Sequence, residues 1–353
     1  MSAKKHILIL ATGGTIASKQ TGAGLAPSYS IDQIIPKASL LRTYYDLTMQ
    51  DILSLDSSNI QIPEWQTIAR AIYASRNDYD GIVVTHGTDT MAYTSSALSY
   101  MLTNLNLPVV LTGSQFPVDE PLSDAHDNLQ TALAMAASGV PGVFLAFNRQ
   151  VMLGTRAVKV RTLDFQAFES VNCPPIAKVN SSGLQFDEQV LQTIRYLRQQ
   201  GGPMQLATEL KAAAFLLKLT PAFNAALLDY LPALGYQAIL LEAFGIGGIN
   251  FLHKDLLQGL GKLIDAGFAV VVTSQCLYEQ SSLRVYEVGR KLLDLGAIEA
   301  FDMSTEAAIT KLYFALGQAE KKQITDPLRR LAFVKDYFSR NLAGEINLAK
   351  QPR

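Results

Sequence analysis

The sequence predicts an α/β fold, with parallel sheets covered by helices on both faces and distributed over two domains. Short, continuously apolar runs alternate along the chain with longer stretches of helical periodicity, which is typical of strands buried between helices. A length of 353 residues exceeds one ordinary compact core and suits two domains. A polar, glycine-bearing stretch interrupts the alternation near the middle of the chain, so we expect the domains to meet there.

Apolar runs and helical faces define an expected N-terminal catalytic domain, residues 1–185. Its strands are predicted at His6–Ala11, Gly81–Thr85, Pro108–Thr112 and Val143–Phe147. A helix is predicted over residues 63–77, with one apolar face made of Trp65, Ile68, Ala69 and Ile72. A second helix is predicted over 123–138, with Ser123 as its N-cap. Its apolar stripe consists of Leu129, Ala132, Leu133 and Ala136.

The remaining chain is expected to form a linker, residues 186–206, and a smaller C-terminal α/β domain, residues 207–353. Its strands are predicted at Ala213–Leu219, Ala238–Leu241 and Phe268–Thr273, and its helices over 252–267, 305–318 and 327–342.

Composition and charge narrow the classes of function. The chain is 48% hydrophobic and 17% charged with a formal net charge of −1, so neither nucleic acid nor a membrane surface is expected as a partner. Two widely separated cysteines indicate a reducing compartment, and four scattered histidines predict no metal site. The first apolar run is too short for a signal peptide, and no segment approaches the roughly 20 apolar residues of a membrane span. We therefore expect a cytoplasmic protein.

Polar residues follow three of the predicted strands and the segment that ends at Leu55. They form the segments Thr12–Thr15, Asp56–Ser58, His86–Thr90 and Gly113–Gln115. Ligands of open parallel sheets bind beyond the carboxyl ends of the strands, so these segments predict a site at one edge.

Other interpretations of the same residues remain open. The segment Thr12–Thr15 fits a tight glycine turn, or a phosphate-binding turn, although it lacks both the G-x-G-x-x-G and the P-loop spacing. Thr88 or Asp89 fits the N-cap of a helix beginning near Thr90. Lys159 fits a solvated surface charge. Its flanking valines favour partial burial instead, and a desolvated lysine has a lowered pKa and can act as a base.

Taken together, these segments resemble the asparaginase/glutaminase family, and its cytoplasmic bacterial type I branch in particular. Two signatures carry the resemblance, ILATGGTIAS from Ile9 to Ser18 and DGIVVTHGTDTMAYT from Asp80 to Thr94. Further similar stretches are Leu111–Pro117, Gly154–Asn172 and Ser274–Arg290. The resemblance implies a larger N-terminal domain with a flavodoxin-like sheet, a smaller C-terminal α/β domain, and a homodimer or homotetramer.

The resemblance also implies roles for individual residues. Thr15 matches the nucleophile, and Thr88, Asp89 and Lys159 match the second catalytic group. Ser57, in the turn Asp56–Ser58, matches the position that holds the α-carboxylate of the substrate, and Asp89 matches the carboxylate that receives its α-amino group. Together, Asp56, Ser57, Ser58, Thr88 and Asp89 are the expected substrate-binding residues.

One position departs from the family pattern. Many members carry a tyrosine on a mobile loop that follows the nucleophile, hydrogen-bonded to it. Leu25 stands at the matching position here and lacks a hydroxyl, while Tyr29 lies four residues further on. Gly22 and Gly24 are the expected hinges of this loop.

The expected function is hydrolysis of L-asparagine to L-aspartate and ammonia through a threonine nucleophile and a covalent intermediate, without metal or cofactor. One alternative is a broader glutaminase-asparaginase, because one methylene changes binding by only about 1–3 kcal/mol. A second is a non-catalytic amino-acid-binding or nucleotide-binding module. A third is an amidotransferase subunit acting on charged tRNA, for which the near-zero net charge gives no support.

Overall fold

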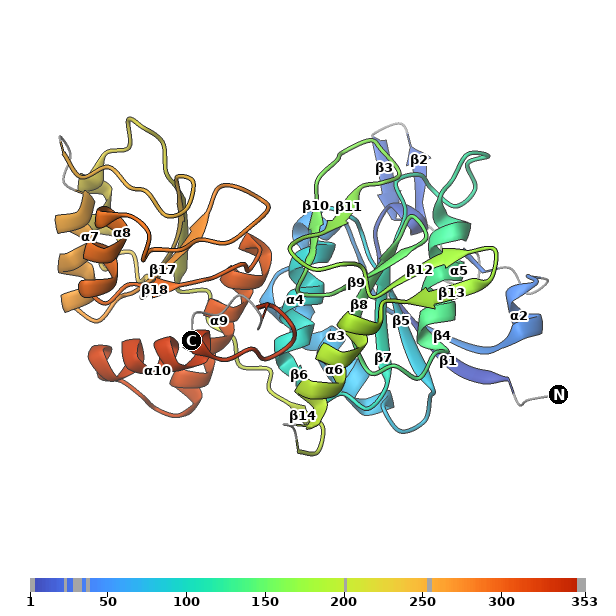
Figure 1. Ribbon diagram of the computed structural model, residues 1–353. Helices are drawn as coiled ribbons and strands as arrows, with labels where there is room; N and C mark the ends of the chain where they lie inside the picture. Colours follow the sequence, from blue (N-terminus) through green and yellow to red (C-terminus); the bar gives the residue numbers. More distant parts are fainter. Residues whose placement is uncertain are drawn as a thin grey trace. The chain divides into compact units, whose positions relative to one another are not determined.

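The computed structural model describes residues 4–21, 24–27, 34–35, 39–199, 202–252 and 256–347. The chain divides into two compact units, Met1–Thr208 and Glu209–Arg353 (Figure 1). Within the described residues, no helix is both long enough and apolar enough to cross a membrane.

The N-terminal unit is built on an eight-stranded sheet in the order β13-β12-β9-β8-β7-β5-β1-β4. Its strands are β1 (Lys5–Gly13), β4 (Tyr45–Leu55), β5 (Gly81–Thr85), β7 (Pro108–Thr112), β8 (Gly142–Phe147), β9 (Gln150–Leu153), β12 (Ala177–Asn180) and β13 (Gly183–Phe186). The five strands from β4 to β8 are parallel, whereas β9, β12 and β13 extend the sheet antiparallel. The parallel strands follow the order 2-1-3-4-5, so the flavodoxin-like sheet is confirmed.

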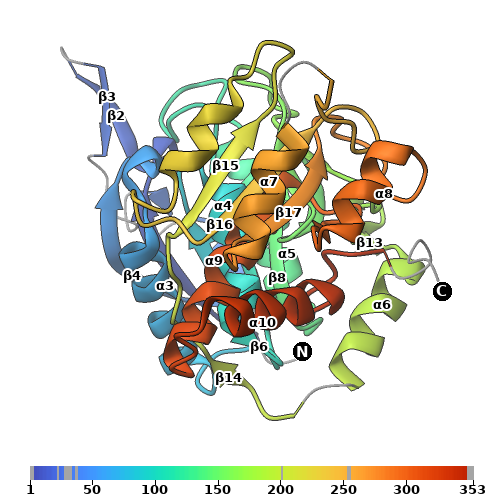
Figure 2. The ribbon, with the colours of Figure 1, turned by 90° about the vertical axis from the view of Figure 1, so that its left-hand side faces the viewer.

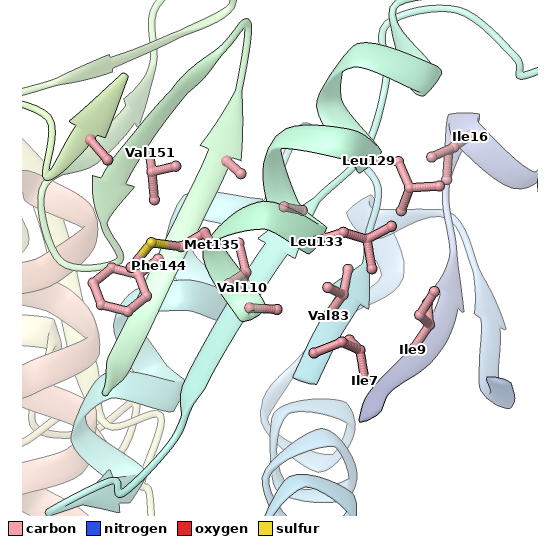
Figure 3. Packing of buried hydrophobic residues seen from close by; sticks show 14 of the residues in the cluster. Ile7, Ile9, Ile16, Val83, Val110, Leu129, Leu133, Met135, Phe144 and Val151 are labelled. Carbon is pink, nitrogen blue, oxygen red and sulfur yellow. The ribbon is translucent and has the colours of Figure 1, made fainter. Parts of the chain in front are cut away.

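Helices cover both faces of this sheet because its strands are apolar on both sides. Every residue of β5 and β7 is buried. α5 (Ala125–Ala136) lies on one face, where Leu129 and Leu133 pack over Ile9, Val83 and Val110 (Figure 3). α3 (Ile62–Ser75) and α4 (Met91–Met101) lie on the other face (Figure 1). Alternate strand residues face opposite sides, so each apolar strand serves both cores.

The C-terminal unit repeats this design on a smaller scale. Its parallel sheet has the order β15-β16-β17-β18, made of β15 (Ala214–Lys218), β16 (Ala238–Ala243), β17 (Ala269–Ser274) and β18 (Ile298–Glu299). α7 (Leu256–Asp265) and α8 (Glu287–Asp294) cover one face and α9 (Thr305–Lys321) covers the other (Figure 1). α10 (Pro327–Ser339) packs against α9 (Figure 2).

Two details differ from the sequence expectations. The segment 186–206, expected as a linker, contains α6 (Glu188–Gln199), and the compact units divide after Thr208. The apolar residues Val190 and Leu191 of α6 are buried in the core of the N-terminal unit, which explains why this polar stretch is helical. The N-cap of α5 is Asp124 rather than Ser123; the Ser123 hydroxyl instead accepts the N–H of Ala125 at 3.1 Å.

Candidate active site

The loops that follow β1, β4 and β5 meet at one edge of the N-terminal sheet. β1 lies between β4 and β5, and the chain leaves β1 toward β4 before it returns to β5. Such a reversal of strand order opens a crevice at the carboxyl ends of the strands, where open α/β sheets bind their ligands. The segment 12–15 spans the end of β1 and the turn after it, and the segments 56–58 and 86–90 follow β4 and β5.

Two glycines bring these loops into direct contact. A Cβ atom at Gly14 would lie 2.3 Å from the backbone nitrogen of Gly87, and φ of Gly14 is +80°. A Cβ atom at Gly87 would lie 2.7 Å from both Cβ and Oγ of Ser57. Only residues without a side chain allow this packing. The loops that carry Thr15, Thr88 and Ser57 are therefore in contact, because Thr15 follows Gly14, Thr88 follows Gly87, and Ser57 itself packs on Gly87.

Thr15 opens the short 3-10 helix η1 (Thr15–Ala17) immediately after β1 and is half-buried. Ile16 and Ala17 are buried in the core under α5 and fix the start of this turn. The loop is also tied to β5, since the Thr12 hydroxyl donates to the carbonyl oxygen of Thr85 at 2.8 Å.

Lys159 joins the site from a separate antiparallel ribbon, β10 (Ala157–Lys159) and β11 (Phe168–Ser170). Its Nζ lies 2.7 Å from Oγ1 of Thr88 and 2.6 Å from Oδ1 of Asp89. The Lys159 side chain is 17% exposed and the Asp89 side chain 67% exposed, so the cation lies further from water than its carboxylate partner. Neither Thr88 nor Asp89 caps α4, whose N-cap is Thr90.

Gln115, after β7, belongs to this group although no role was expected for it. Its side-chain oxygen accepts from the Thr88 hydroxyl at 3.3 Å, and its amide nitrogen donates to the carbonyl oxygens of Thr162 and Asp164. Gln115 therefore connects Thr88 to the loop that follows Lys159. Two signals in the sequence pointed to it, its place after a strand at the same sheet edge and the family-like stretch Leu111–Pro117 that contains it.

The turn Asp56–Ser58 presents Ser57 inward and its neighbours outward. Ser57 is 3% exposed, and its carbonyl oxygen accepts from the Thr90 hydroxyl at 2.7 Å. The Asp56 carboxylate accepts from the backbone N–H and the hydroxyl of Ser58, and these bonds hold the pKa of Asp56 below its usual value. Asp56 and Ser58 thus bond to each other and shape the turn around Ser57.

The expected site residues are therefore brought together to different degrees. Thr88, Asp89 and Lys159 are in direct contact, and Thr15 and Ser57 adjoin them through Gly14 and Gly87. Leu25 lies on the ribbon of β2 (Ser18–Thr21) and β3 (Gly24–Pro27), while Gly22 and Tyr29 lie outside the described residues. Among the described residues, no three of His, Cys, Asp or Glu group as metal ligands would.

Two family models match the chain. The one described as "Asparaginase, N-terminal" matches residues 6–192, and the one described as "Glutaminase/Asparaginase C-terminal domain" matches residues 214–326. The chain belongs to the asparaginase family.

Proteins similar to this chain include L-asparaginases and a tRNA amidotransferase subunit. An L-asparaginase of Thermococcus kodakarensis is 42% identical, over 96% of this chain and 98% of its own length. A solved structure of the thermostable L-asparaginase of that organism has a TM-score of 0.85 at 41% identity, covering 97% of this chain and 99% of the other. A subunit of the glutamyl-tRNA(Gln) amidotransferase of Pyrococcus furiosus is 35% identical over 98% of this chain and 78% of its own length.

Proposed function

We propose that this chain, an amidohydrolase by its family, hydrolyses L-asparagine to L-aspartate and ammonia. The observation that carries the proposal is the position of Nζ of Lys159, within hydrogen-bonding distance of both the Thr88 hydroxyl and the Asp89 carboxylate. Binding of an amino acid alone does not require a lysine against a hydroxyl. Proton transfer does, because such a pair can pass a proton to and from a reacting group.

The proposed first step is attack by the Thr15 hydroxyl oxygen on the carbon of the substrate's side-chain amide. A threonine hydroxyl is a weak nucleophile, so its proton passes through the Thr88 hydroxyl to Lys159, which accepts it as the neutral amine. The C–N bond then breaks, the leaving nitrogen takes up a proton and departs as ammonia, and an ester joins the substrate to Thr15. Water adds to this ester, the C–O bond to Thr15 breaks, and aspartate leaves with the hydroxyl restored.

The substrate is a zwitterion, so its recognition needs a donor for the carboxylate and an acceptor for the ammonium. We assign the first role to the turn of Ser57 and the second to Asp89. The exposure of the Asp89 side chain, 67%, supports this assignment because its carboxylate can reach a ligand while one oxygen remains on Lys159. Asp56 and Ser58 support the turn.

We also propose a cytoplasmic homo-oligomer, dimer or tetramer. Support for a reducing compartment comes from Cys276, a free thiol exposed on the surface. Two alternatives remain: a broader glutaminase-asparaginase, and an activity related to that named for the tRNA amidotransferase relatives. The 35% identity of this chain to an amidotransferase subunit favours the amidotransferase-related activity. The 42% identity to an L-asparaginase that is matched over 98% of its length favours the asparaginase activity.

The proposal is tested by measuring ammonia release from free asparagine and glutamine with purified protein. Thr15→Ala removes the attacking oxygen and is expected to lower kcat about a thousandfold or more. Thr67→Ala is the matched control, since Thr67 lies exposed on α3 and its hydroxyl bonds only within the helix. Undiminished activity of the folded Thr15→Ala protein would remove Thr15 from the nucleophile role. A kcat/KM for glutamine equal to that for asparagine would favour the broader enzyme.

A further inference from the structure

A buried chain of hydrogen bonds lies directly beneath the loop of Thr88. The indole N–H of Trp65 on α3 donates to Oγ1 of Thr94 on α4 at 2.9 Å. The same Oγ1 lies 2.9 Å from Nε2 of His86, and Nδ1 of His86 lies 2.7 Å from the carbonyl oxygen of Gly87. His86 and Thr94 are completely buried and Trp65 is 6% exposed, so water does not compete for these bonds.

The chemistry of the partners fixes the direction of the bonds at the two ends of this chain, and the protonation state of His86 decides the bond between them. An indole nitrogen can only donate, so Thr94 accepts from Trp65 and has its own proton free for Nε2 of His86. A carbonyl oxygen can only accept, so Nδ1 of His86 must carry a hydrogen to bond Gly87. The opposite tautomer would set the Nδ1 lone pair against the carbonyl oxygen at 2.7 Å, which is repulsive. Nδ1 of His86 therefore carries a hydrogen, and in the neutral ring Nε2 is the acceptor for the Thr94 hydroxyl.

The charged imidazolium does not fit this place. Burial of the ring lowers the pKa of His86 to about 4, although the bond to Gly87 opposes the shift. An imidazolium would also carry a hydrogen on Nε2, and the Thr94 hydroxyl could then no longer donate to it.

The carbonyl oxygen that His86 holds belongs to the peptide bond between Gly87 and Thr88. A peptide unit is planar, so a fixed carbonyl also fixes the direction of the Thr88 N–H and the start of the Thr88 side chain. Gly14 and Ser57 pack against Gly87 on its other sides. Without His86, the carbonyl would lose its partner in a buried place and the peptide could rotate away.

We propose that His86 is a positioning residue for the reaction, held by the chain from Trp65 through Thr94 and itself holding the Gly87–Thr88 peptide so that Thr88 meets Lys159. The inference rests on the proposed role of Thr88. It adds to that role a neutral histidine that touches neither substrate nor reacting atoms and acts through one backbone carbonyl.

The protonation state is read directly from the side-chain nitrogen shifts of ¹⁵N-histidine-labelled wild-type protein. Substituting His6, His126 and His253 in turn identifies the fourth signal set as that of His86. We expect His86 at pH 7 to show a protonated Nδ1 and an unprotonated Nε2. A protonated Nε2, in the neutral or the charged ring, would overturn the proposal.

Kinetics then test the effect on the reaction. Thr94→Val keeps the shape but removes the donor to His86, and we expect kcat to fall about tenfold or more while KM changes less than about threefold. Thr94→Ser restores a hydroxyl and is expected to recover most of kcat. Thr131→Val is the control, because Thr131 is a buried helical threonine on α5 whose hydroxyl bonds only to Asp127.

The outcomes separate this inference from the proposed function. Wild-type kcat in Thr94→Val, with Thr88→Val inactive, would refute the positioning role of His86 and leave the proposed chemistry standing. Wild-type activity in Thr88→Val would refute the proposed chemistry itself. A loss in Thr94→Val that Thr94→Ser does not recover would also count against the positioning role.

Discussion

At the scale of single residues, the amine of Lys159 makes the contacts in the site, while its neighbours in the strand provide the packing. Ala157 and Val158 are buried and hold the ribbon in place, while only the end of Lys159 reaches Thr88 and Asp89. Lys159→Met preserves most of the side-chain volume and removes the amine. We expect kcat to fall by about 100-fold or more with the fold unchanged, because the relay loses its proton carrier.

The control for this prediction is Lys178→Met, at an exposed position on β12. Circular dichroism and ammonia release measured on both variants distinguish lost chemistry from lost structure. An active Lys159→Met protein would show that Thr88 needs no lysine.

The lowered pKa of His86 predicts how the stability of the protein depends on pH, independently of catalysis. Its pKa is about 4 in the folded protein against an ordinary value of 6.5, so below pH 6.5 the unfolded chain takes up a proton that the folded protein does not bind. Stability is therefore lost as the pH falls from about 6.5 to 4, by roughly 3 kcal/mol from this residue alone. Urea unfolding of wild type and His86→Gln at several pH values measures the difference in their free energies of unfolding. This difference should be constant above about pH 6.5 and should shrink as the pH falls from about 6.5 to 4. A pH-independent difference would mean that His86 has an ordinary pKa.

At the scale of the elements, three strand-end loops depend on two glycines for their contact. Gly87→Ala would place a Cβ atom 2.7 Å from Ser57, so the turn of Ser57 must move. We expect a destabilisation of about 1 to 3 kcal/mol from overpacking, together with a higher KM for asparagine, because the displaced turn is the proposed carboxylate site. Thermal unfolding and steady-state kinetics measure the two effects. Gly202→Ala is the control, since a Cβ atom there meets nothing within 4 Å; an unchanged KM in Gly87→Ala would separate Ser57 from substrate binding.

Most of the parallel strands were predictable from the sequence because they are continuous apolar runs, but β4, which carries many polar residues, was not. Gly81–Thr85 and Pro108–Thr112 have the predicted bounds. The outer strands β9, β12 and β13 were not predicted, since they have only four residues each. α6 was hidden for a similar reason: its few apolar residues stand between glycine-bearing segments that resemble a linker.

The site was predictable only in part. Polar loops after successive parallel strands indicated the sheet edge, and that much followed from local pattern. The contact between Lys159 and Thr88 spans 71 residues, and no spacing rule predicts it; the family resemblance supplied it. Gln115 and the chain through Thr94 were missed because their partners lie on other elements, where only the folded structure brings them together.

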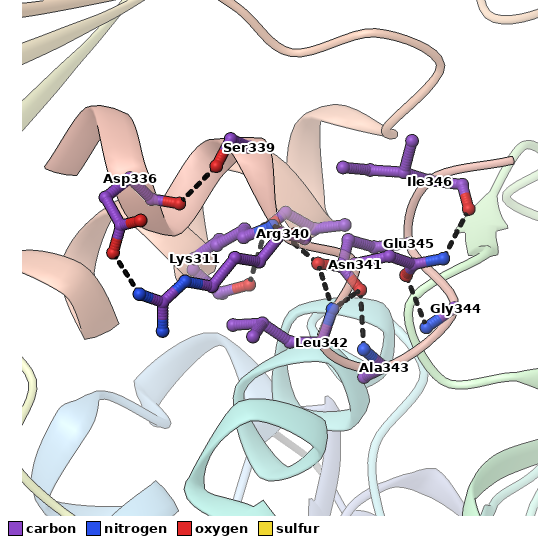
Figure 4. A network of polar contacts seen from close by, with 12 residues as sticks. Lys311, Asp336, Ser339, Arg340, Asn341, Leu342, Ala343, Gly344, Glu345 and Ile346 are labelled. Carbon is purple, nitrogen blue, oxygen red and sulfur yellow. Dashed lines mark hydrogen bonds and ion pairs between the residues drawn. The ribbon is translucent and has the colours of Figure 1, made fainter. Parts of the chain in front are cut away.

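At the scale of the whole molecule, the C-terminal unit contains a buried ion pair that fastens the segment after α10 to α9. Nζ of Lys311 on α9 lies 2.5 Å from Oε1 of Glu345, and both side chains are 0% exposed (Figure 4). Lys311 also donates to the carbonyl oxygen of Arg340, while the Glu345 carboxylate accepts the N–H groups of Leu342 and Ala343. Burial alone would raise the pKa of Glu345, but Lys311 and these N–H groups outweigh it and hold the pKa below 4.5.

Removing one partner should therefore leave an unpaired charge in the core. We expect Lys311→Met to destabilise the C-terminal unit by about 3 to 5 kcal/mol, measured by calorimetry. Because the pKa of Glu345 is lowered by folding, its contribution is present in full above about pH 4.5 and is lost as the pH falls. Lys211→Met breaks an ion pair of similar length with Glu320 that is partly in water, and is expected to cost about 1 kcal/mol or less. Equal losses in the two variants would contradict a special role for the buried pair.

The strand β4 ends the large sheet on the side opposite β13, and among the described strands it pairs with β1 alone. Its eleven residues leave a long row of backbone donors and acceptors open to a strand from another molecule. Asp46, Gln50 and Asp51 are exposed along it. Two carboxylates on this border would repel an incoming copy of the same border, since identical charges would meet. The acidic residues of β4 would thus oppose the pairing of this rim with the rim of a second copy.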